Sequence, residues 1–373
     1  MKRIAILTLN GYFNYGNRLQ NYAMQELLSS LGFSVETIIN DRSNKVKPVE
    51  RIHNLSKNSI GELYIRLYKK YQRNIYIKRI IQRTNIFESF TLKCIRETDY
   101  KISKNNIPND LSGRYDYFVV GSDQVWNPNN LHGSSIYFLT FAERHKRIAY
   151  APSIGVSEIE AEDLANYKQW ILGMHRLSVR EDDGAKIIKE LTGREAPVLV
   201  DPTLLLTKKK WLSVSNEANN KPKGKYLLTY FLGGIPKEYK KQIRSIAKDN
   251  KLEVINLGDM QEKDTYITGP SEFISYINSC SVFCTDSFHG CVFAILMERP
   301  FIVYERMGTS ASMYSRIETL LGKFDLNSRK AERIKNNEDV FNISYSHVPP
   351  ILEEERNKAL SYLKEALNVE DGK

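Results

Sequence analysis

One stretch decides the fold class, residues 282–294, and it reads Val282-Phe283-Cys284-Thr285-Asp286-Ser287-Phe288-His289-Gly290-Cys291-Val292-Phe293-Ala294. A short apolar run typical of a buried strand is followed by a polar cluster, a glycine and a second apolar run, long enough for about two helical turns. We interpret this order as strand, tight turn and helix. In an open α/β sheet, ligands bind beyond the carboxyl ends of the strands, where such a turn opens a helix.

The polar turn of this stretch contains the groups of an anion-binding site. The first N–H groups of a helix lack intrahelical partners and the helix dipole is positive there, so this end of a helix attracts anions. Ser287 or Asp286 is suited to cap the helix, and His289, next to Gly290, is suited to approach a bound anion. A capped helix with an incidental histidine is the alternative, and this stretch alone does not decide between them.

The amino-terminal part of the chain repeats the same order of elements. It contains, in sequence, a strand, a loop rich in Asn and Gly, a helix with apolar residues at helical spacing and a second strand, over residues 2–9, 10–17, 18–32 and 33–39. A doubly wound α/β domain begins in this way. The loop matches neither the GxGxxG pattern nor a Walker loop, but its amides are suited to contact a substrate.

Changes in composition divide the chain into parts. Further strands are predicted at residues 115–120, 147–151, 176–181 and 196–200, and the lysine-rich residues 208–225 precede a second series of strands and helices. We therefore expect a first Rossmann-like domain over residues 1–207, a second over 208–345 and a carboxyl-terminal helix within 346–373.

Residues 42–109 form a basic insert in the first domain, rich in Lys, Arg, Asn and Tyr. Apolar and cationic residues alternate there at helical spacing, which favours a helix. Such a helix either packs on the domain through its apolar stripe or lies on an anionic bilayer surface.

The overall composition is that of a soluble protein with an anionic partner. The 373 residues carry a formal net charge of +10 with 42% hydrophobic residues, and no apolar run reaches the length of a membrane span. We expect no signal peptide, a cytoplasmic location and four reduced cysteines that bind no metal. The basic charge also motivates a non-enzymatic nucleic-acid-binding protein, but no nucleic-acid recognition motif supports that alternative.

Polar residues recur where the predicted strands end. These positions are Asn14 to Asn17, Ser122, Asp123, Gln124, Ser153, Arg180, Asp286 to His289 and Arg306. Because parallel strands end at one edge of a sheet, we expect these side chains to face one crevice between the two domains. Arginines would bind a phosphate and a carboxylate there, and a histidine would transfer a proton near neutral pH.

Five short motifs, in this order, resemble the polysaccharide pyruvyl transferase family. They are Asn14-Tyr15-Gly16-Asn17-Arg18-Leu19-Gln20-Asn21-Tyr22-Ala23, Val120-Gly121-Ser122-Asp123-Gln124-Val125-Trp126, Ser178-Val179-Arg180-Glu181, Val200-Asp201-Pro202-Thr203 and Thr285-Asp286-Ser287-Phe288-His289-Gly290. The resemblance extends from the first strand to about residue 314. One departure is Asn17, where many members have an aspartate, so the acceptor site of this chain is expected to differ.

The resemblance implies an α/β fold of the GT-B type, with two Rossmann-like domains facing a central cleft. It implies transfer of pyruvate from phosphoenolpyruvate, without a further cofactor or metal, to a sugar of a bacterial surface polysaccharide or its lipid-linked precursor at the inner face of the cell membrane. Expected catalytic residues are His289, Arg180 and Asp123. Expected substrate contacts are Asn14, Gly16, Asn17, Ser122, Gln124, Ser153, Ser287, Phe288, Gly290 and Arg306.

The roles within this set differ. The acceptor is expected on the first domain and the donor on the second, with Arg180 on the donor's carboxylate or phosphate and His289 in proton transfer, phosphate stabilisation or both. A glycosyltransferase of the same architecture that uses a nucleotide sugar remains the alternative function.

Overall fold

The computed structural model describes residues 1–41, 60–129, 134–307 and 314–369, with side chains from residue 74 onward in the long helix α2. The first half of the chain contains β1 (Arg3–Leu7), α1 (Tyr15–Ser30), β2 (Ser34–Asn40), α2 (Ile60–Cys94), β3 (Glu97–Ile102), β4 (Tyr117–Val120), β5 (Arg147–Ala149), α3 (Leu164–Leu172) and α4 (Asp182–Thr192). Its strands are parallel and lie in the order β3-β2-β1-β4-β5.

The second half has the same architecture. It contains α5 (Lys208–Ser213), β6 (Tyr226–Tyr230), α6 (Lys237–Asp249), β7 (Glu253–Leu257), α7 (Lys263–Tyr266), α8 (Pro270–Ser279), β8 (Val282–Thr285), α9 (Phe288–Met297), β9 (Phe301–Val303), α10 (Ser315–Lys323) and α11 (Val348–Ala366). Its parallel strands lie in the order β7-β6-β8-β9. The central strands β4 and β8 are buried at every position, as continuous apolar strands of parallel sheets covered on both faces should be.

Each sheet changes its direction of winding at one pair of strands. In the first sheet this pair is β1 and β4, and in the second it is β6 and β8. Ligands of open α/β sheets bind beyond the carboxyl ends of such pairs. The motifs at 121–124 and 286–290 follow β4 and β8 directly, so the topology puts both motifs at these positions.

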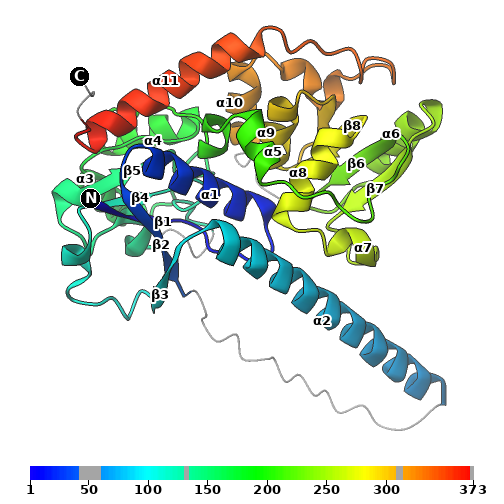
Figure 1. The fold of residues 1–373 in the computed structure, drawn as a ribbon, viewed down its shortest axis with the longest axis horizontal. Helices are drawn as coiled ribbons and strands as arrows, with labels where there is room; N and C mark the ends of the chain where they lie inside the picture. Colours follow the sequence, from blue (N-terminus) through cyan, green and yellow to red (C-terminus); the bar gives the residue numbers. More distant parts are fainter. Residues whose placement is uncertain (42–59, 130–133, 308–313, 370–373) are drawn as a thin grey trace.

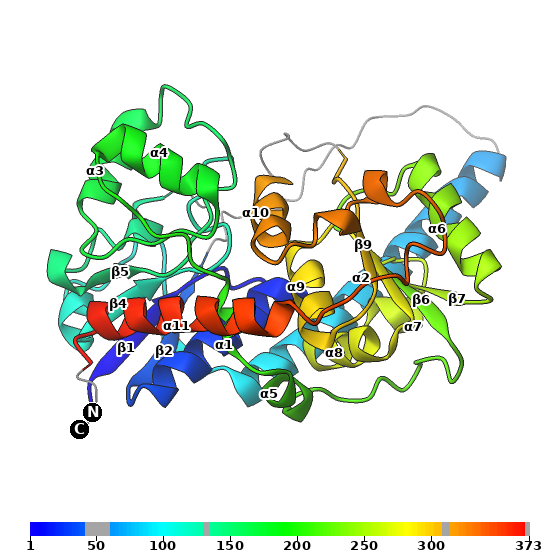
Figure 2. The ribbon, with the colours of Figure 1, turned by 90° about the horizontal axis from the view of Figure 1, so that it is seen from above.

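Two helices connect the halves. Figure 2 shows α11 crossing from the second half back over the first, where Ala359 and Leu363 belong to one apolar cluster with the β1 residues Ile4 and Ile6. Figure 1 shows α2 passing beneath both halves. Arg83 of α2 donates hydrogen bonds to the carbonyl oxygen of Phe13 in the first half and to that of Thr268 in the second.

An aromatic stack lies between the halves. Tyr15 of α1 stacks on Phe273 of α8, with ring centroids 4.2 Å apart, and on Phe87 of α2 at 5.3 Å. Its hydroxyl donates to the carbonyl oxygen of Thr268 at 3.0 Å. One apolar cluster therefore contains residues of both sheets' helices, and the two halves are joined by core-like packing.

Four details differ from the sequence-based expectation, and the first is that α1 begins at Tyr15, inside the predicted loop 10–17. The segment 42–109, expected to be helical, also contributes the strand β3, in which Thr98 and Ile102 are buried and their neighbours are not. Residues 176–181 and 196–200 make only single bridges instead of strands, and beside the bridge between Val179 and Val198, Pro197 has no N–H group to continue the pairing. Helix α9 begins at Phe288, so His289 lies in its first turn.

Candidate active site

The loops after β1 and β4 are held together by buried polar contacts. Thr8 Oγ1 donates to the carbonyl oxygen of Ser122 at 3.2 Å. Gln20 of α1 donates to Thr8 Oγ1 at 2.7 Å, and its side-chain oxygen accepts from Ser122 N at 3.1 Å. All three side chains are buried, so the polar end of β4 has a fixed position beside α1.

The first turns of α1 and α9 are capped in the same way. The Asn14 side chain accepts from Asn17 N at 3.4 Å, and the Ser287 hydroxyl accepts from Gly290 N at 3.2 Å. Neither helix has an acidic residue in its first turn. The positive ends of both dipoles are therefore available to an anion.

Gly16 and His289 bring these two helix ends into contact. A Cβ atom at Gly16 would lie 2.1 Å from Nδ1 of His289, so only glycine permits the imidazole ring at this place. His289 is 7% exposed. Gly290 is similarly required, since a Cβ there would lie 2.8 Å from Thr285 Oγ1. Two positive helix ends therefore meet at one imidazole.

Asp201 lies beneath this junction and contacts its main polar groups. Its Oδ2 accepts from Arg180 at 2.8 Å and from Ser122 Oγ at 2.9 Å, and it lies 3.4 Å from Nε2 of His289. Its Oδ1 accepts from the amide and hydroxyl of Thr203 at 3.0 and 2.7 Å. Nε2 of His289 lies at ion-pair distance from this carboxylate but makes no hydrogen bond among the described residues.

The charges around Asp201 keep it ionised. Burial by itself raises the pKa of this carboxyl group, but the charges of His289 and Arg180 outweigh burial and hold the pKa well below its ordinary value.

Arg180 lies among carboxylates and against an aromatic ring. Besides Asp201, it pairs with Asp123 at 3.5 Å, and its guanidinium lies 4.2 Å from the ring centroid of Phe288. Its Nε is buried without a hydrogen-bond partner among the described residues. Arg180 and His289 thus come together at Asp201 Oδ2, as the sequence motifs predicted that they would share one site.

Asp123 has a strained backbone at the tip of the loop after β4. Its φ of 65° is rare for a residue with a side chain. Asn17 Nδ2 donates to its Oδ2 at 2.9 Å. Burial raises the pKa of Asp123, but Arg180, His289 and Arg316 together lower it below its ordinary value. The carboxylate is therefore ionised and oriented by Asn17.

Gln124 faces an arginine of the other half. With the side-chain amide oriented to satisfy its neighbours, its oxygen accepts from both terminal nitrogens of Arg316, at 2.7 and 3.1 Å. Arg316 is 5% exposed and belongs to α10. Burial and the charges of Arg180 and Arg306 lower its pKa to about 10.

Arg306 follows β9 and pairs with Asp286. Arg306 Nε lies 3.2 Å from Asp286 Oδ2, and Nη2 donates to the Asp286 carbonyl oxygen at 3.1 Å. The same carboxylate accepts from the amides of Leu232 and Gly233 at 2.7 and 2.9 Å. Asp286 therefore fixes the loop after β6, and Ser287, not Asp286, caps α9.

Comparison with known proteins identifies the family of this chain. The family model described as polysaccharide pyruvyl transferase matches residues 14–306, most of the chain. This chain belongs to the polysaccharide pyruvyl transferase family. Members of this family are enzymes, and the family implies a pyruvyl donor and a polysaccharide acceptor. No curated protein matches the chain.

Solved structures similar to this pyruvyl transferase show its fold. A putative UDP-N-acetylglucosamine 2-epimerase from Listeria monocytogenes is 11% identical, with a TM-score of 0.52 over 99% of this chain and 97% of that one. The UDP-GlcNAc 2-epimerase of Methanocaldococcus jannaschii is 11% identical, with a TM-score of 0.50 over 97% and 100%. The predicted fold class, α/β of the GT-B type with two parallel sheets, is confirmed.

Three residues of the pyruvyl transferase site had no predicted role. Asp201 was part of a quoted motif, and its position after an extended segment was the available signal. Glu181, next to Arg180, is fully buried and accepts from the amides of Ile154 and Gly155 at 2.8 and 3.1 Å. Arg316 lies beyond the matched residues, and nothing in its local sequence points to the site.

Ser153 lies at the inner edge of the site. Its hydroxyl is fully buried and has no hydrogen-bond partner among the described residues, as is the case for Glu181 Oε2. A buried polar atom without a hydrogen bond destabilises the fold. The Ser153 hydroxyl and Glu181 Oε2 are therefore suited to contact a bound water or ligand oxygen.

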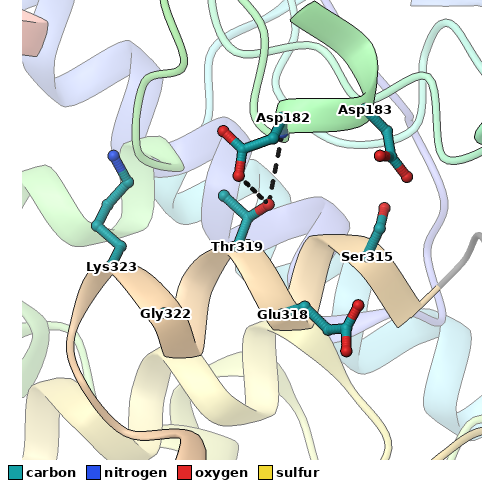
Figure 3. A pocket seen from close by; sticks show the side chains of 7 residues that line it. All are labelled: Asp182, Asp183, Ser315, Glu318, Thr319, Gly322 and Lys323. Carbon is teal, nitrogen blue, oxygen red and sulfur yellow. Dashed lines mark hydrogen bonds between the residues drawn. The ribbon is translucent and has the colours of Figure 1, made fainter. Parts of the chain in front are cut away.

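A hollow of about 430 Å³ separates α4 of the first half from α10 of the second (Figure 3). Thr319 of α10 joins the two helices, because its Oγ1 accepts from Asp182 N at 3.4 Å and donates to Asp182 Oδ2 at 3.1 Å. Ser315 and Glu318 of α10 line the hollow opposite Asp183. The two halves thus touch through exposed polar groups on this side.

The described residues contain no group of three or more His, Cys, Asp or Glu side chains arranged to hold a metal ion. Cys280 and Cys284 are buried free thiols, and burial raises the pKa of each to about 12. These thiols are therefore protonated at neutral pH and act as apolar core groups.

Proposed function

We propose that this pyruvyl transferase moves the pyruvyl group of phosphoenolpyruvate to a sugar of a bacterial surface polysaccharide, or of its lipid-linked precursor, as a ketal that bridges two hydroxyls. The observation that supports this most directly is the contact between the α1 and α9 amino-termini at His289. Phosphoenolpyruvate carries a phosphate and a carboxylate, and helix amino-termini and arginines bind both groups.

In the proposed reaction, His289 donates a proton to the methylene carbon of phosphoenolpyruvate, and a cationic centre develops at C2. A sugar hydroxyl adds to C2 and releases its proton, after which the bond from C2 to the phosphate oxygen breaks. A second hydroxyl of the sugar adds to C2 and closes the ketal. Of the two hydroxyl protons, one restores the proton that His289 gave to the methylene carbon, and the other leaves with phosphate.

The neighbours of His289 fit these steps. Asp201 stabilises the imidazolium before proton transfer, because its carboxylate stays ionised 3.4 Å from Nε2. We assign Arg180 to the carboxylate or phosphate of the donor, and Arg306 is a second candidate for that contact. Asp123, oriented by Asn17, is ionised and suited to accept the proton of the attacking hydroxyl.

The test is incubation with phosphoenolpyruvate and a panel of aryl and lipid-linked glycosides, read by mass spectrometry for an added pyruvate ketal and by phosphate release. A His289→Gln variant should lower turnover by about 10²–10⁴-fold. Retained melting temperature shows that the variant is folded. Near-normal turnover in the folded variant contradicts the assignment of His289.

A thermal-shift screen separates the two classes of donor. Phosphoenolpyruvate should raise the melting temperature, because a ligand that binds only the folded state stabilises it. A rise with UDP- or dTDP-sugars and none with phosphoenolpyruvate would instead support a nucleotide-sugar glycosyltransferase.

We further propose that the acceptor is met at the inner face of the cell membrane, with α2 against anionic lipid. Ile77, Ile80 and Ile81 of α2 are 43%, 43% and 53% exposed, and Lys78 lies exposed between them. The spacing puts the three isoleucines on adjacent parts of one helix surface. No helix among the described residues is both long and apolar enough to cross a bilayer.

Vesicle flotation tests the membrane contact. Replacing Lys69, Lys70, Arg73 and Lys78 by Gln should reduce binding to vesicles of phosphatidylglycerol and phosphatidylcholine, since each basic residue near such a surface contributes about 1 kcal/mol. The first three side chains lie outside the described residues. Equal flotation of the variant and the parent removes α2 from the proposal.

A further inference from the structure

A second pocket, with a volume of about 520 Å³, lies at the carboxyl ends of β6 and β7. Helix α6 forms one wall through Lys240, Ile243 and Arg244, and the loops after β6 and β7 form the others. The volume falls in the range of small-molecule sites, about 300–1,000 Å³. The residues that line this pocket are distinct from the candidate catalytic residues His289, Arg180 and Asp123.

The floor of this pocket is a fixed polar network. Thr229, 2% exposed, donates through Oγ1 to Asn256 Oδ1 at 2.7 Å. Asn256 Nδ2 donates to Glu262 Oε1 at 2.5 Å, and Thr265 Oγ1 lies 3.4 Å from Glu262 Oε2. An amide and a carboxylate are therefore held in one orientation before any ligand arrives, which lowers the entropy lost on binding.

The composition of the walls suits a neutral sugar. Phe231, Ile235 and Val254 provide apolar surface for the C–H face of a pyranose, while Asn256 and Glu262 provide a donor and acceptors for its hydroxyls. The titratable groups balance, since Lys240 and Arg244 face Asp259 and Glu262. With two cationic and two anionic side chains, the lining offers no net positive charge to a diphosphate, whereas an uncharged sugar needs none.

The pocket adjoins the candidate active site. Gly233 lines the pocket, donates to Asp286 Oδ2 at 2.9 Å and lies so close to Arg306 that a Cβ would be 2.8 Å from Arg306 Cγ. Asp286 directly precedes Ser287, the cap of α9. A glycan held in the pocket therefore has its next unit near Arg306 and the first turn of α9.

We propose that the pocket at the ends of β6 and β7 binds a neutral pyranose of the acceptor glycan, next to the sugar that receives the ketal. The identification of this sugar as part of the acceptor rests on the proposed function, whereas the binding of a pyranose in the pocket does not. It moves part of the acceptor contact to the second half, whereas the sequence motifs predicted the acceptor on the first.

The binding arm uses the protein without donor and the methyl glycosides of glucose, galactose, mannose and N-acetylmannosamine, observed by saturation-transfer NMR. At least one glycoside should give a signal that the Glu262→Gln and Asp259→Asn variants weaken about tenfold in affinity, because a hydrogen bond to a charged group is lost. Glu253→Gln is the matched control, since Glu253 is exposed at the opposite end of β7. It should bind as the parent does.

The transfer arm uses the full reaction. With an acceptor identified by mass spectrometry, Glu262→Gln should raise the KM for the glycan about tenfold and leave the KM for phosphoenolpyruvate unchanged. Unchanged glycan KM with normal pyruvyl transfer overturns the pocket proposal and leaves the proposed function intact. Glycoside binding that is lost in Glu262→Gln, without transfer to any acceptor, sustains the pocket and defeats the proposed function. Absence of every glycoside signal, or a signal displaced by UDP alone, also overturns the pocket proposal.

Discussion

At the scale of single residues, Gly16 is the position where the smallest change should have the largest effect. Gly16→Ala would bring a Cβ within 2.1 Å of His289 Nδ1 in a buried place, so the imidazole must move. We expect turnover to fall at least about 10²-fold, as for loss of a positioned proton donor, with a loss of stability of about 1–3 kcal/mol. Phosphate release and chemical denaturation measure the two effects.

The matched control is Gly322→Ala, because Gly322 is also helical and a Cβ there meets no atom within 4 Å. It should keep full activity and gain a little stability, since Ala favours helix over Gly. Equal activity of both variants would mean that His289 tolerates displacement.

Asp201 connects stability with pH. Its pKa is lowered in the folded protein, so its ionised form stabilises the fold above the unfolded pKa of about 3.9 and this contribution is lost only as the pH falls through the lower, folded pKa. Asp201→Asn should cost about 3 kcal/mol at pH 7 by breaking a buried ion pair. Denaturation from pH 8 to pH 3 should give a constant difference from the parent down to about pH 5, and a smaller one below pH 4.

The control for Asp201 is Asp325→Asn, because Asp325 is exposed. The same chemical change there should shift the unfolding free energy by less than about 0.5 kcal/mol. A difference that grows as the pH falls below 4 would contradict the lowered pKa of Asp201.

At the scale of elements, α2 is held to both halves by Arg83. Its guanidinium donates to the carbonyl oxygens of Phe13 at 3.0 Å, of Thr268 at 3.4 Å and of Tyr266. Arg83→Met keeps the apolar stem but removes the donor of the Phe13 and Tyr266 oxygens, while Thr268 keeps the hydroxyl of Tyr15, so we expect a loss of about 2–4 kcal/mol in the free energy of unfolding. Lys78→Met, exposed on the same helix, should be nearly neutral, and equal losses in the two variants would show that Arg83 contributes no more than an exposed cation.

The elements themselves were largely predictable where local pattern determines them. The apolar run at 282–285 and the helix after it follow from burial and periodicity, and β8 and α9 occur there. The strand β3 was missed because the basic composition of 42–109 hid the alternation of Thr98 and Ile102. The single bridges at 176–181 depend on neighbours that are distant in sequence, so no local pattern determines how far they extend.

At the scale of the whole molecule, the stack of Tyr15 on Phe273 and Phe87 predicts cooperative unfolding. Two halves that share an apolar cluster should lose it together, although many two-domain proteins unfold in steps. We expect one calorimetric transition whose enthalpy equals the van't Hoff enthalpy. Phe273→Ala should lower the free energy of unfolding by about 3–5 kcal/mol. It should also make the unfolding of the two halves less cooperative. Two resolved transitions in the parent protein would refute this prediction.

The sequence by itself determined the fold class, the family and the order of the motifs, because strand burial, helical periodicity and glycine-bounded turns are local properties of the chain. Only the tertiary structure decided that Asp201 joins Arg180 to His289, that Arg316 reaches Gln124 from the other half and that Gly16 admits the imidazole. Those contacts link residues from different elements and both halves. Their distances depend on how two sheets and their helices pack, which is a property of the assembled core rather than of any segment within it.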